Sequence, residues 1–363
     1  MKDLDKFRGC LIGGAAGDAL GYPVEFMDED AIFSKYGEGG IREYELLNNE
    51  ALISDDTQMT LFTANGLLLG TTRKAEKDEF YPYYHYVSVC YRDWLRTQDE
   101  KLPSDEGREK TYSWLYNVDD MFGKRAPGYA CMSALRSGKT GMISDPVNPD
   151  SKGCGGVMRV APVGLYFEPG CRLDSELDMI GAQVAAITHG HELGYIPAAT
   201  LTHIIRRITY DDISIPEAVN SAMDATVKLF PGSKHLGYYT ELMERAVRLA
   251  HDDADDLDAI HELGEGWVAE EALAIAVYCA VKYEDDFEKA IIAAVNHKGD
   301  SDSTGSITGN IVGAHIGLKR IPDKFVTNLE LREVILEIAT DLYNDYSDDE
   351  TWARKYKYMT YPK

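Results

Sequence analysis

The sequence predicts an all-α protein. Apolar residues recur at three- and four-residue spacing in many windows, including 61–70, 176–187, 239–250 and 269–283, as in helices with one buried face. Strong helix formers dominate these windows. Alternating strand-like runs are scarce and no strand–helix rhythm appears, which argues against a doubly wound sheet or a TIM barrel. We expect a compact, orthogonal multi-helix bundle forming a single domain over residues 1–363.

The composition narrows the class of function. The chain has 61 acidic and 37 basic residues and a net charge of -24, so its surface should repel nucleic acid and anionic lipid. No apolar run approaches the roughly 18 residues of a membrane span, and no signal peptide is evident. We therefore expect a cytoplasmic protein without membrane or nucleic-acid partners. The six cysteines form no Cys-x-x-Cys pair and no zinc-type spacing.

Glycines recur at a spacing of four in two distant segments. Gly9, Gly13, Gly17 and Gly21 form one series, and Gly305, Gly309, Gly313 and Gly317 form the other. Glycine inside a helix costs roughly 1 kcal/mol relative to alanine, so such a stripe is typical of a face where another backbone approaches closely. We expect the two helices to pack together, or each to lie against another central helix. Direct packing would bring Asp18 and Glu25 near Asp300 and Asp302.

Two acidic pairs stand where helical periodicity begins. One is "SDDT" at 54–57, and the other is "DSDST" at 300–304. Each site alone is explained by helix capping, because Asp and Ser are common N-cap residues. If the four aspartates converge, however, two like charges about 4 Å apart repel by roughly 4 kcal/mol at an effective dielectric of 20. Two divalent cations would neutralise them, and carboxylate and hydroxyl oxygens suit Mg²⁺ or Mn²⁺.

Six motifs, in this order, resemble those of the ADP-ribosylglycohydrolase family across nearly the whole chain. They are "GCLIGGAAGDALGYPVEF" (9–26), "SDDTQM" (54–59), "GCGGVMRVAPVGL" (153–165), "THGH" (188–191), "LGEGWVAEEALAIAVYC" (263–279) and "GDSDSTG" (299–305). The resemblance implies an all-α fold with two Mg²⁺ or Mn²⁺ ions. The implied ligands are Ser54, Asp55, Asp56, Asp300, Asp302 and Ser303, with Asp302 bridging both ions.

The resemblance also implies the roles of other residues. Asp55 or Asp56 would act as acid or base or position water, and Glu25 matches a mobile acid that closes over the metals. The glycine-rich loop of Gly153, Cys154, Gly155 and Gly156 is either an ordinary turn or a diphosphate cradle; relatives often carry Asn where Cys154 stands. His189 would contact a phosphate or the distal ribose, and Trp267 is either a core residue or an adenine shelf.

The implied activity is hydrolysis of the ribose C1″ bond of an ADP-ribosylated protein or small molecule, releasing ADP-ribose. The wording of "GDSDSTG" favours ADP-ribosyl-arginine as substrate. Two alternatives stay open. In the first, the protein is a hydrolase whose substrate is ADP-ribosyl-serine or a small ADP-ribosylated metabolite. In the second, the protein binds ADP-ribose, or blocks a toxin, without turnover. The presence of all four aspartates argues against a non-catalytic scaffold.

Overall fold

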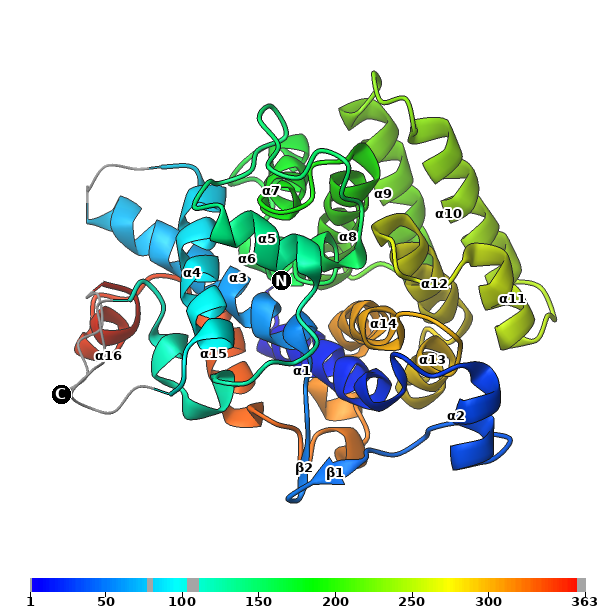
Figure 1. Cartoon of the computed structure of the whole chain (residues 1–363). Helices are drawn as coiled ribbons and strands as arrows, with labels where there is room; N and C mark the ends of the chain where they lie inside the picture. The colour runs from blue at the N-terminus through cyan, green and yellow to red at the C-terminus, as the bar shows by residue number, and fades with distance from the viewer. Residues whose placement is uncertain (1, 77–80, 103–110, 358–363) are drawn as a thin grey trace.

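The structure, a computed structural model, describes residues 2–76, 81–102 and 111–357. It confirms the all-α prediction (Figure 1). The α-helices are α1 (Leu4–Gly21), α2 (Glu29–Tyr36), α3 (Asp55–Ala75), α4 (Tyr83–Asp99), α5 (Tyr129–Arg136), α6 (Ala161–Tyr166), α7 (Asp174–Ala186), α8 (Glu192–Asp211), α9 (Ile215–Leu229), α10 (Leu236–Ala250), α11 (Asp256–Leu263), α12 (Ala269–Lys282), α13 (Phe287–Val295), α14 (Ser301–Ile316), α15 (Arg332–Asn344) and α16 (Glu350–Trp352).

Short elements connect these helices. The only sheet in the described part of the chain is the hairpin of β1 (Leu46–Leu47) and β2 (Glu50–Ala51). The 3₁₀ turns are η1 (Tyr22–Val24), η2 (Trp114–Asn117), η3 (Asp119–Met121), η4 (Cys154–Gly156), η5 (Leu318–Arg320) and η6 (Asp323–Phe325), and η7 (Ala353–Lys357) is a π-helical turn. No helix among the described residues combines the length and apolarity needed to cross a membrane.

The two glycine stripes pack against each other, as predicted. Helices α1 and α14 lie side by side at the centre of the molecule (Figure 1). A methyl group built on Gly305 would lie 2.5 Å from the carbonyl oxygen of Gly17, and Gly309 and Gly313 face Gly13 and Gly9 in the same way. The pairing is antiparallel, so the end of α1 meets the beginning of α14. This arrangement brings the chain after α1 to the first turn of α14.

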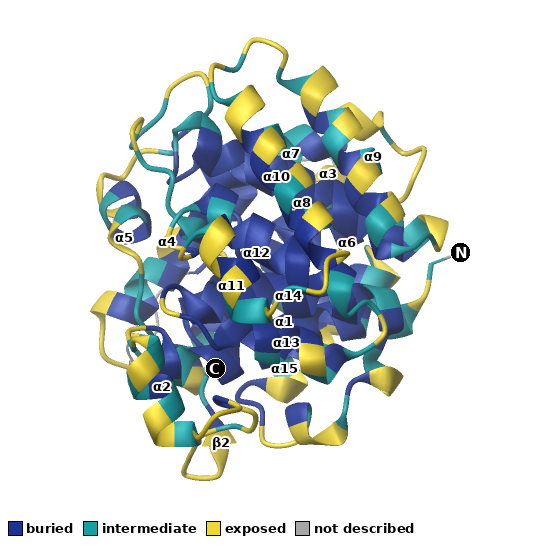
Figure 2. Cartoon of the chain, turned by 90° about the vertical axis from the view of Figure 1, so that its right-hand side faces the viewer, coloured by how far each residue is buried: buried dark blue, intermediate teal, exposed yellow. Residues whose placement is uncertain are grey.

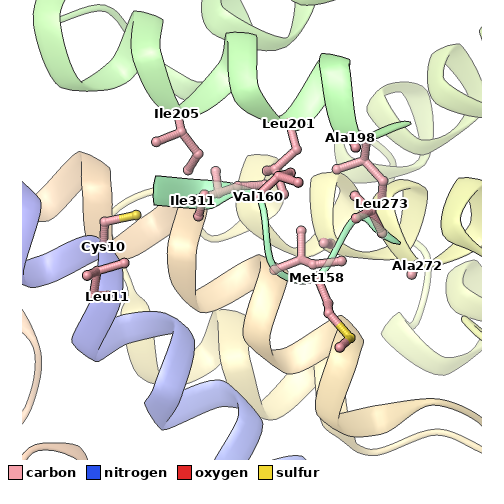
Figure 3. Packing of buried hydrophobic residues seen from close by; sticks show 14 of the residues in the cluster. Cys10, Leu11, Met158, Val160, Ala198, Leu201, Ile205, Ala272, Leu273 and Ile311 are labelled. Atoms are coloured by element: carbon pink, nitrogen blue, oxygen red, sulfur yellow. The ribbon is translucent and has the colours of Figure 1, made fainter. Parts of the chain in front are cut away.

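The rest of the core surrounds this helix pair. Residues of α1, α12, α13 and α14 are mostly buried, whereas α2 and α11 expose one face (Figure 2). Cys10 of α1 and Ile311 of α14 belong to the same buried cluster as Leu201 of α8 and Leu273 of α12 (Figure 3). Both central helices are therefore held on several sides, which fixes where their ends lie.

Candidate functional site

A cavity of about 370 Å³ lies where α3 and α14 begin and where α1 ends. Its volume falls in the range of small-molecule sites, about 300–1,000 Å³. All the catalytic, substrate-contact and metal-binding residues predicted from the sequence line it, except Ser54 and Gly156. Those two residues are immediate chain neighbours of Asp55 and Gly155, which do line it. The structure thus brings the predicted residues together from six separate motifs.

Helix α3 begins at this cavity because two side chains cap it. The Ser54 hydroxyl accepts a hydrogen bond from the Asp56 amide at 3.1 Å. The Asp18 carboxylate, from α1, accepts hydrogen bonds from the amides of Ser54 at 2.9 Å and Thr57 at 3.0 Å, and from the Thr57 hydroxyl. Asp18 therefore ties the start of α3 to α1. Asp55 lies beside the 126–128 loop, where its carboxylate accepts a longer hydrogen bond, 3.4 Å, from the Gly128 amide.

Helix α14 begins on the opposite side of the same acidic group. Asp300 caps the helix, accepting from the Ser303 amide at 3.4 Å, and the Asp302 carboxylate accepts from that amide at 2.9 Å. Carboxylate oxygens of Glu25, Asp300 and Asp302 all lie within 4.8 Å of one another. All three of these acids are buried. Glu25 therefore lies beside Asp300 and Asp302, as the glycine stripes predicted, whereas Asp18 binds the start of α3 and does not line the cavity.

Several of these carboxylates are buried without compensation. Among the described residues, Asp56 Oδ1 and Glu25 Oε2 are buried and find no hydrogen-bond partner. Burial raises the pKa of Asp55, Asp56 and Asp302 well above the usual range, and neighbouring carboxylates raise it further. Burial, followed by the charges of Asp300, Asp55 and Asp18, raises the pKa of Glu25 to about 9. A cluster of this kind is stabilised by protons or by cations.

The glycine-rich loop forms the wall facing the acids. Residues 154–156 make the 3₁₀ turn η4, and the amide of Cys154 donates to the Trp267 carbonyl at 3.2 Å. That amide is consequently not free to bind a ligand, which corrects one part of the predicted cradle. The first amides of a helical turn lack carbonyl partners within the turn, and Gly155 stands there. A Cβ at Gly155 would lie 2.9 Å from Cys131 Sγ and 3.1 Å from His189 Cε1, so a side chain at this position would press on both residues.

A buried arginine influences the protonation and the hydrogen bonding of His189. Arg159 donates to the Thr188 hydroxyl at 2.7 Å, and that hydroxyl lies 2.8 Å from His189 Nδ1. The Thr188 hydroxyl accepts from the guanidinium, which can only donate; when its own hydrogen is directed to Nδ1, the ring proton of a neutral His189 is on Nε2. Burial, and then the Arg159 charge, lowers the pKa of His189 to about 3. His189 is therefore a neutral N–H donor at the cavity wall beside Gly153 and Gly155.

Two aromatic rings stand at the rim of the cavity. Phe26 stacks on Trp267 with ring centroids 5.8 Å apart and planes inclined by 22°. Phe26 is 75% exposed and Trp267 is 38% exposed. Trp267 is thus a cavity residue rather than a core residue. Tyr129, which is 86% exposed, also lines the cavity.

Sequence reasoning missed three contributions to this site. Phe26 follows Glu25 directly, but an apolar side chain reads as core unless its exposure is known. The glycine stripe predicts that Asp18 lies near the site but does not reveal that its carboxylate binds the amides at the start of α3. Arg159, inside the motif "GCGGVMRVAPVGL", is fully buried and donates to the Thr188 hydroxyl. Its position between the glycine loop and Pro162, the second residue of α6, was the only available signal.

Comparison with known proteins identifies the family to which the chain belongs. A sequence model of the ADP-ribosylglycohydrolase family matches residues 1–351. Similar proteins include an uncharacterized protein of Archaeoglobus fulgidus, 28% identical over 93% of this chain and 96% of that protein. They also include mouse ADP-ribosylhydrolase ARH3, 22% identical over 96% of this chain and 93% of that protein.

A bacterial relative and a solved structure extend the comparison. The Rhodospirillum rubrum ADP-ribosyl-dinitrogen reductase glycohydrolase is 24% identical over 90% of this chain and 91% of its own length. A solved chain of an ADP-ribosylglycohydrolase-related protein complex shares the fold, with a TM-score of 0.64, 24% identity and coverage of 94% of this chain and 98% of that chain. The chain therefore belongs to the ADP-ribosylglycohydrolase family, whose members hydrolyse ADP-ribosylated substrates.

Proposed function

We propose that the protein hydrolyses the bond between ribose C1″ and the guanidino nitrogen of ADP-ribosyl-arginine on a protein, with two divalent cations, Mg²⁺ or Mn²⁺, at the acidic cluster. The observation that carries this proposal is the meeting of buried carboxylates from Glu25, α3 and α14 at one end of the cavity. A protein that only bound ADP-ribose would have no need of so many acids around the reacting end.

The donor set fits hard divalent cations. Asp56 Oδ1 and Glu25 Oε2 are buried oxygens without a partner among the described residues, and buried ionised carboxylates require compensation. On this proposal Ser54, Asp55 and Asp56 would hold one ion, and Asp300, Asp302 and Ser303 would hold the other. Such ions, when bound, would supply positive charge to orient a ribose diol and stabilise charge at the reacting sugar.

The remaining cavity residues match the other parts of an ADP-ribose molecule. The N–H of the neutral His189 ring and the backbone amide of Gly155 offer donors for diphosphate oxygens. The exposed rings of Trp267 and Phe26 offer a flat apolar surface for adenine. The net charge of -24 favours a cationic arginine side chain over an anionic partner.

The chemistry needs a group that both accepts and returns a proton. Asp55 or Asp56 would take a proton from the attacking water as its oxygen bonds to C1″. The C1″–N bond breaks, and the proton passes to the departing guanidino nitrogen, so that arginine and ADP-ribose leave. Two carboxylates at the start of one helix suit this exchange because both side chains line the cavity.

The test compares three substrates under matched conditions. The protein is incubated with ADP-ribosyl-arginine, ADP-ribosyl-serine or O-acetyl-ADP-ribose in the presence of Mg²⁺, Mn²⁺ or EDTA. We expect release of ADP-ribose from the arginine conjugate that EDTA abolishes. If only the serine conjugate or only the acetyl ester is hydrolysed, that compound, and not ADP-ribosyl-arginine, represents the substrate. Tight ADP-ribose binding without hydrolysis of any of the three substrates would show that the protein is a binding or immunity protein and not an enzyme.

A further inference from the structure

A second cavity lies among α7, α8 and α9. Its volume is about 560 Å³, which also falls in the range of small-molecule sites, about 300–1,000 Å³. Every residue that lines it belongs to one of these three helices, and none of them lines the acidic cavity. Helix α8 packs against both α7 and α9 (Figure 1). A side chain on α8 can therefore contact groups on both neighbouring helices at once.

Three side chains in this cavity form a hydrogen-bonded chain of aspartate, histidine and serine. His203 Nδ1 lies 2.8 Å from Asp178 Oδ2, and His203 Nε2 lies 3.0 Å from Ser221 Oγ. A carboxylate can only accept a hydrogen bond. When Asp178 is ionised, the ring proton of a neutral His203 is therefore on Nδ1, and Nε2 accepts the hydrogen of Ser221. In this arrangement a histidine can take the proton of a serine nucleophile.

A buried arginine compensates the charge of Asp178. Arg206 Nη2 lies 3.3 Å from Asp178 Oδ1, and both residues are 2% exposed. A buried carboxylate requires such compensation. Arg206 Nη2 also lies 3.2 Å from His203 Nδ1. If Arg206 donated to an unprotonated Nδ1, that nitrogen and Asp178 Oδ2 would face each other at 2.8 Å without a hydrogen between them. The three distances fit best when the arginine and the ring N–H both donate to Asp178.

The surroundings of Ser221 suit a small ester. Ser221 is half-buried and lines the cavity. Ala225 and Leu229 stand four and eight residues further along α9 and line the same cavity, so they provide an apolar surface for a short acyl chain. Lys228 lines it as well, and helical side chains point back toward the helix N-terminus, which is the direction of Ser221. A positive charge on that side would stabilise the oxyanion of an acyl transfer.

We propose that Ser221 is the nucleophile of a second active site that hydrolyses small carboxylic esters, with His203 as general base and Asp178 as a positioning residue. Ser221 Oγ bonds to the carbonyl carbon while its hydrogen passes to His203 Nε2. The bond from that carbon to the alcohol oxygen breaks, and the alcohol leaves with the proton from His203. Water then bonds to the acyl carbon and gives one proton to His203. The carboxylic acid leaves, and that proton returns to Ser221 Oγ.

The experiment uses two reagents that report on a serine nucleophile, both in the presence of EDTA. A fluorophosphonate forms a bond between serine Oγ and phosphorus as fluoride leaves, and peptide mass spectrometry locates the modified residue. The second reagent is p-nitrophenyl acetate, whose hydrolysis is followed by the absorbance of nitrophenolate. The variants are Ser221→Ala and His203→Gln. The matched control is Ser175→Ala, because Ser175 lines the same cavity but belongs to α7 and is not the serine bonded to His203.

We expect the fluorophosphonate to modify Ser221 in the wild type and in the Ser175→Ala control. Ser221→Ala should lose the modification. Both Ser221→Ala and His203→Gln should lower the protein-dependent hydrolysis of p-nitrophenyl acetate about 100-fold or more, since a positioned general base contributes about 10²–10⁴-fold. Circular dichroism should show the same helical spectrum for all variants.

Three results would overturn the inference. They are modification of a serine other than Ser221, ester hydrolysis that is undiminished in folded Ser221→Ala, and failure of the wild type to react with either reagent. The last result would mean that the three side chains only hold α7, α8 and α9 together. The inference does not rest on the proposed function, because Ser221→Ala should release ADP-ribose from ADP-ribosyl-arginine as fast as the wild type. Either activity can therefore be absent while the other is present.

Discussion

Replacement of Gly309 by alanine tests how closely α1 and α14 must approach. A Cβ at this position would overlap the Gly13 carbonyl oxygen and lie 2.5 Å from the Gly13 carbonyl carbon. Carbon atoms in contact normally stand about 3.5–4.0 Å apart, so the helices would have to separate by about 1 Å. Both opposing groups belong to helix backbone, which cannot rotate away as a side chain can.

The expected cost follows from two opposing effects. Alanine favours the helix by about 1 kcal/mol relative to glycine. Overpacking typically costs about 1–3 kcal/mol and occasionally more. Because two helix backbones collide here, we take a cost of about 3 kcal/mol or more. Gly309→Ala should therefore lower the free energy of unfolding by about 2 kcal/mol or more. The measurement is urea-induced unfolding of the metal-free protein, followed by circular dichroism.

The matched control is Gly237→Ala. Gly237 is the second residue of α10, and a Cβ there would meet nothing within 4 Å. That variant should be as stable as the wild type or up to about 1 kcal/mol more stable. If Gly309→Ala behaves like Gly237→Ala, the close approach of α1 and α14 is not what the protein requires, and the reasoning about the glycine stripes is wrong.

Three further predictions concern the site. Asp302→Ala should abolish Mn²⁺ binding in calorimetry while the helical circular dichroism spectrum persists; undiminished affinity would exclude Asp302 as a ligand. His189, with a pKa of about 3 in the folded state and about 6.5 in the unfolded state, binds its proton more readily when unfolded, so its contribution makes the protein less stable as pH falls through that interval. Relative to His189→Gln, the wild type should lose about 2 kcal/mol of stability between about pH 7 and pH 5, and parallel pH profiles would refute this. Thr188→Val should weaken ADP-ribose binding about 5–30-fold through loss of the Nδ1 hydrogen bond and change the ¹⁵N signals of the His189 ring, whereas Thr188→Ser should restore both.

The fold was accessible from the sequence because it depends on repeated local patterns. Glycines at a spacing of four residues lie on one face of a helix. Two such faces of equal length therefore predicted that α1 and α14 pack against each other. The helix starts at Asp55 and Ser301 were marked by capping residues immediately before them. Together these features predicted that acids from both ends of the chain would meet.

Other features depend on contacts that no local pattern records. Asp18 accepts hydrogen bonds from the amides of Ser54 and Thr57 at the start of α3. It reaches them because the packing of α1 against α14 fixes the position of Asp18 in the fold. The Cys154 amide is used by Trp267, a residue more than a hundred positions away. Phe26 is exposed at the rim of the cavity, where it stacks on Trp267, whereas its hydrophobicity alone predicts burial.

The central claim is that the acids of α3 and α14 share a pair of divalent ions. Its most direct test is a crystal structure of the protein grown with Mn²⁺, with the anomalous difference density calculated for manganese. The account predicts two peaks about 3.5–4 Å apart, between Asp56 on one side and Asp302 on the other. Absence of anomalous density between those two side chains, at saturating Mn²⁺, would contradict it.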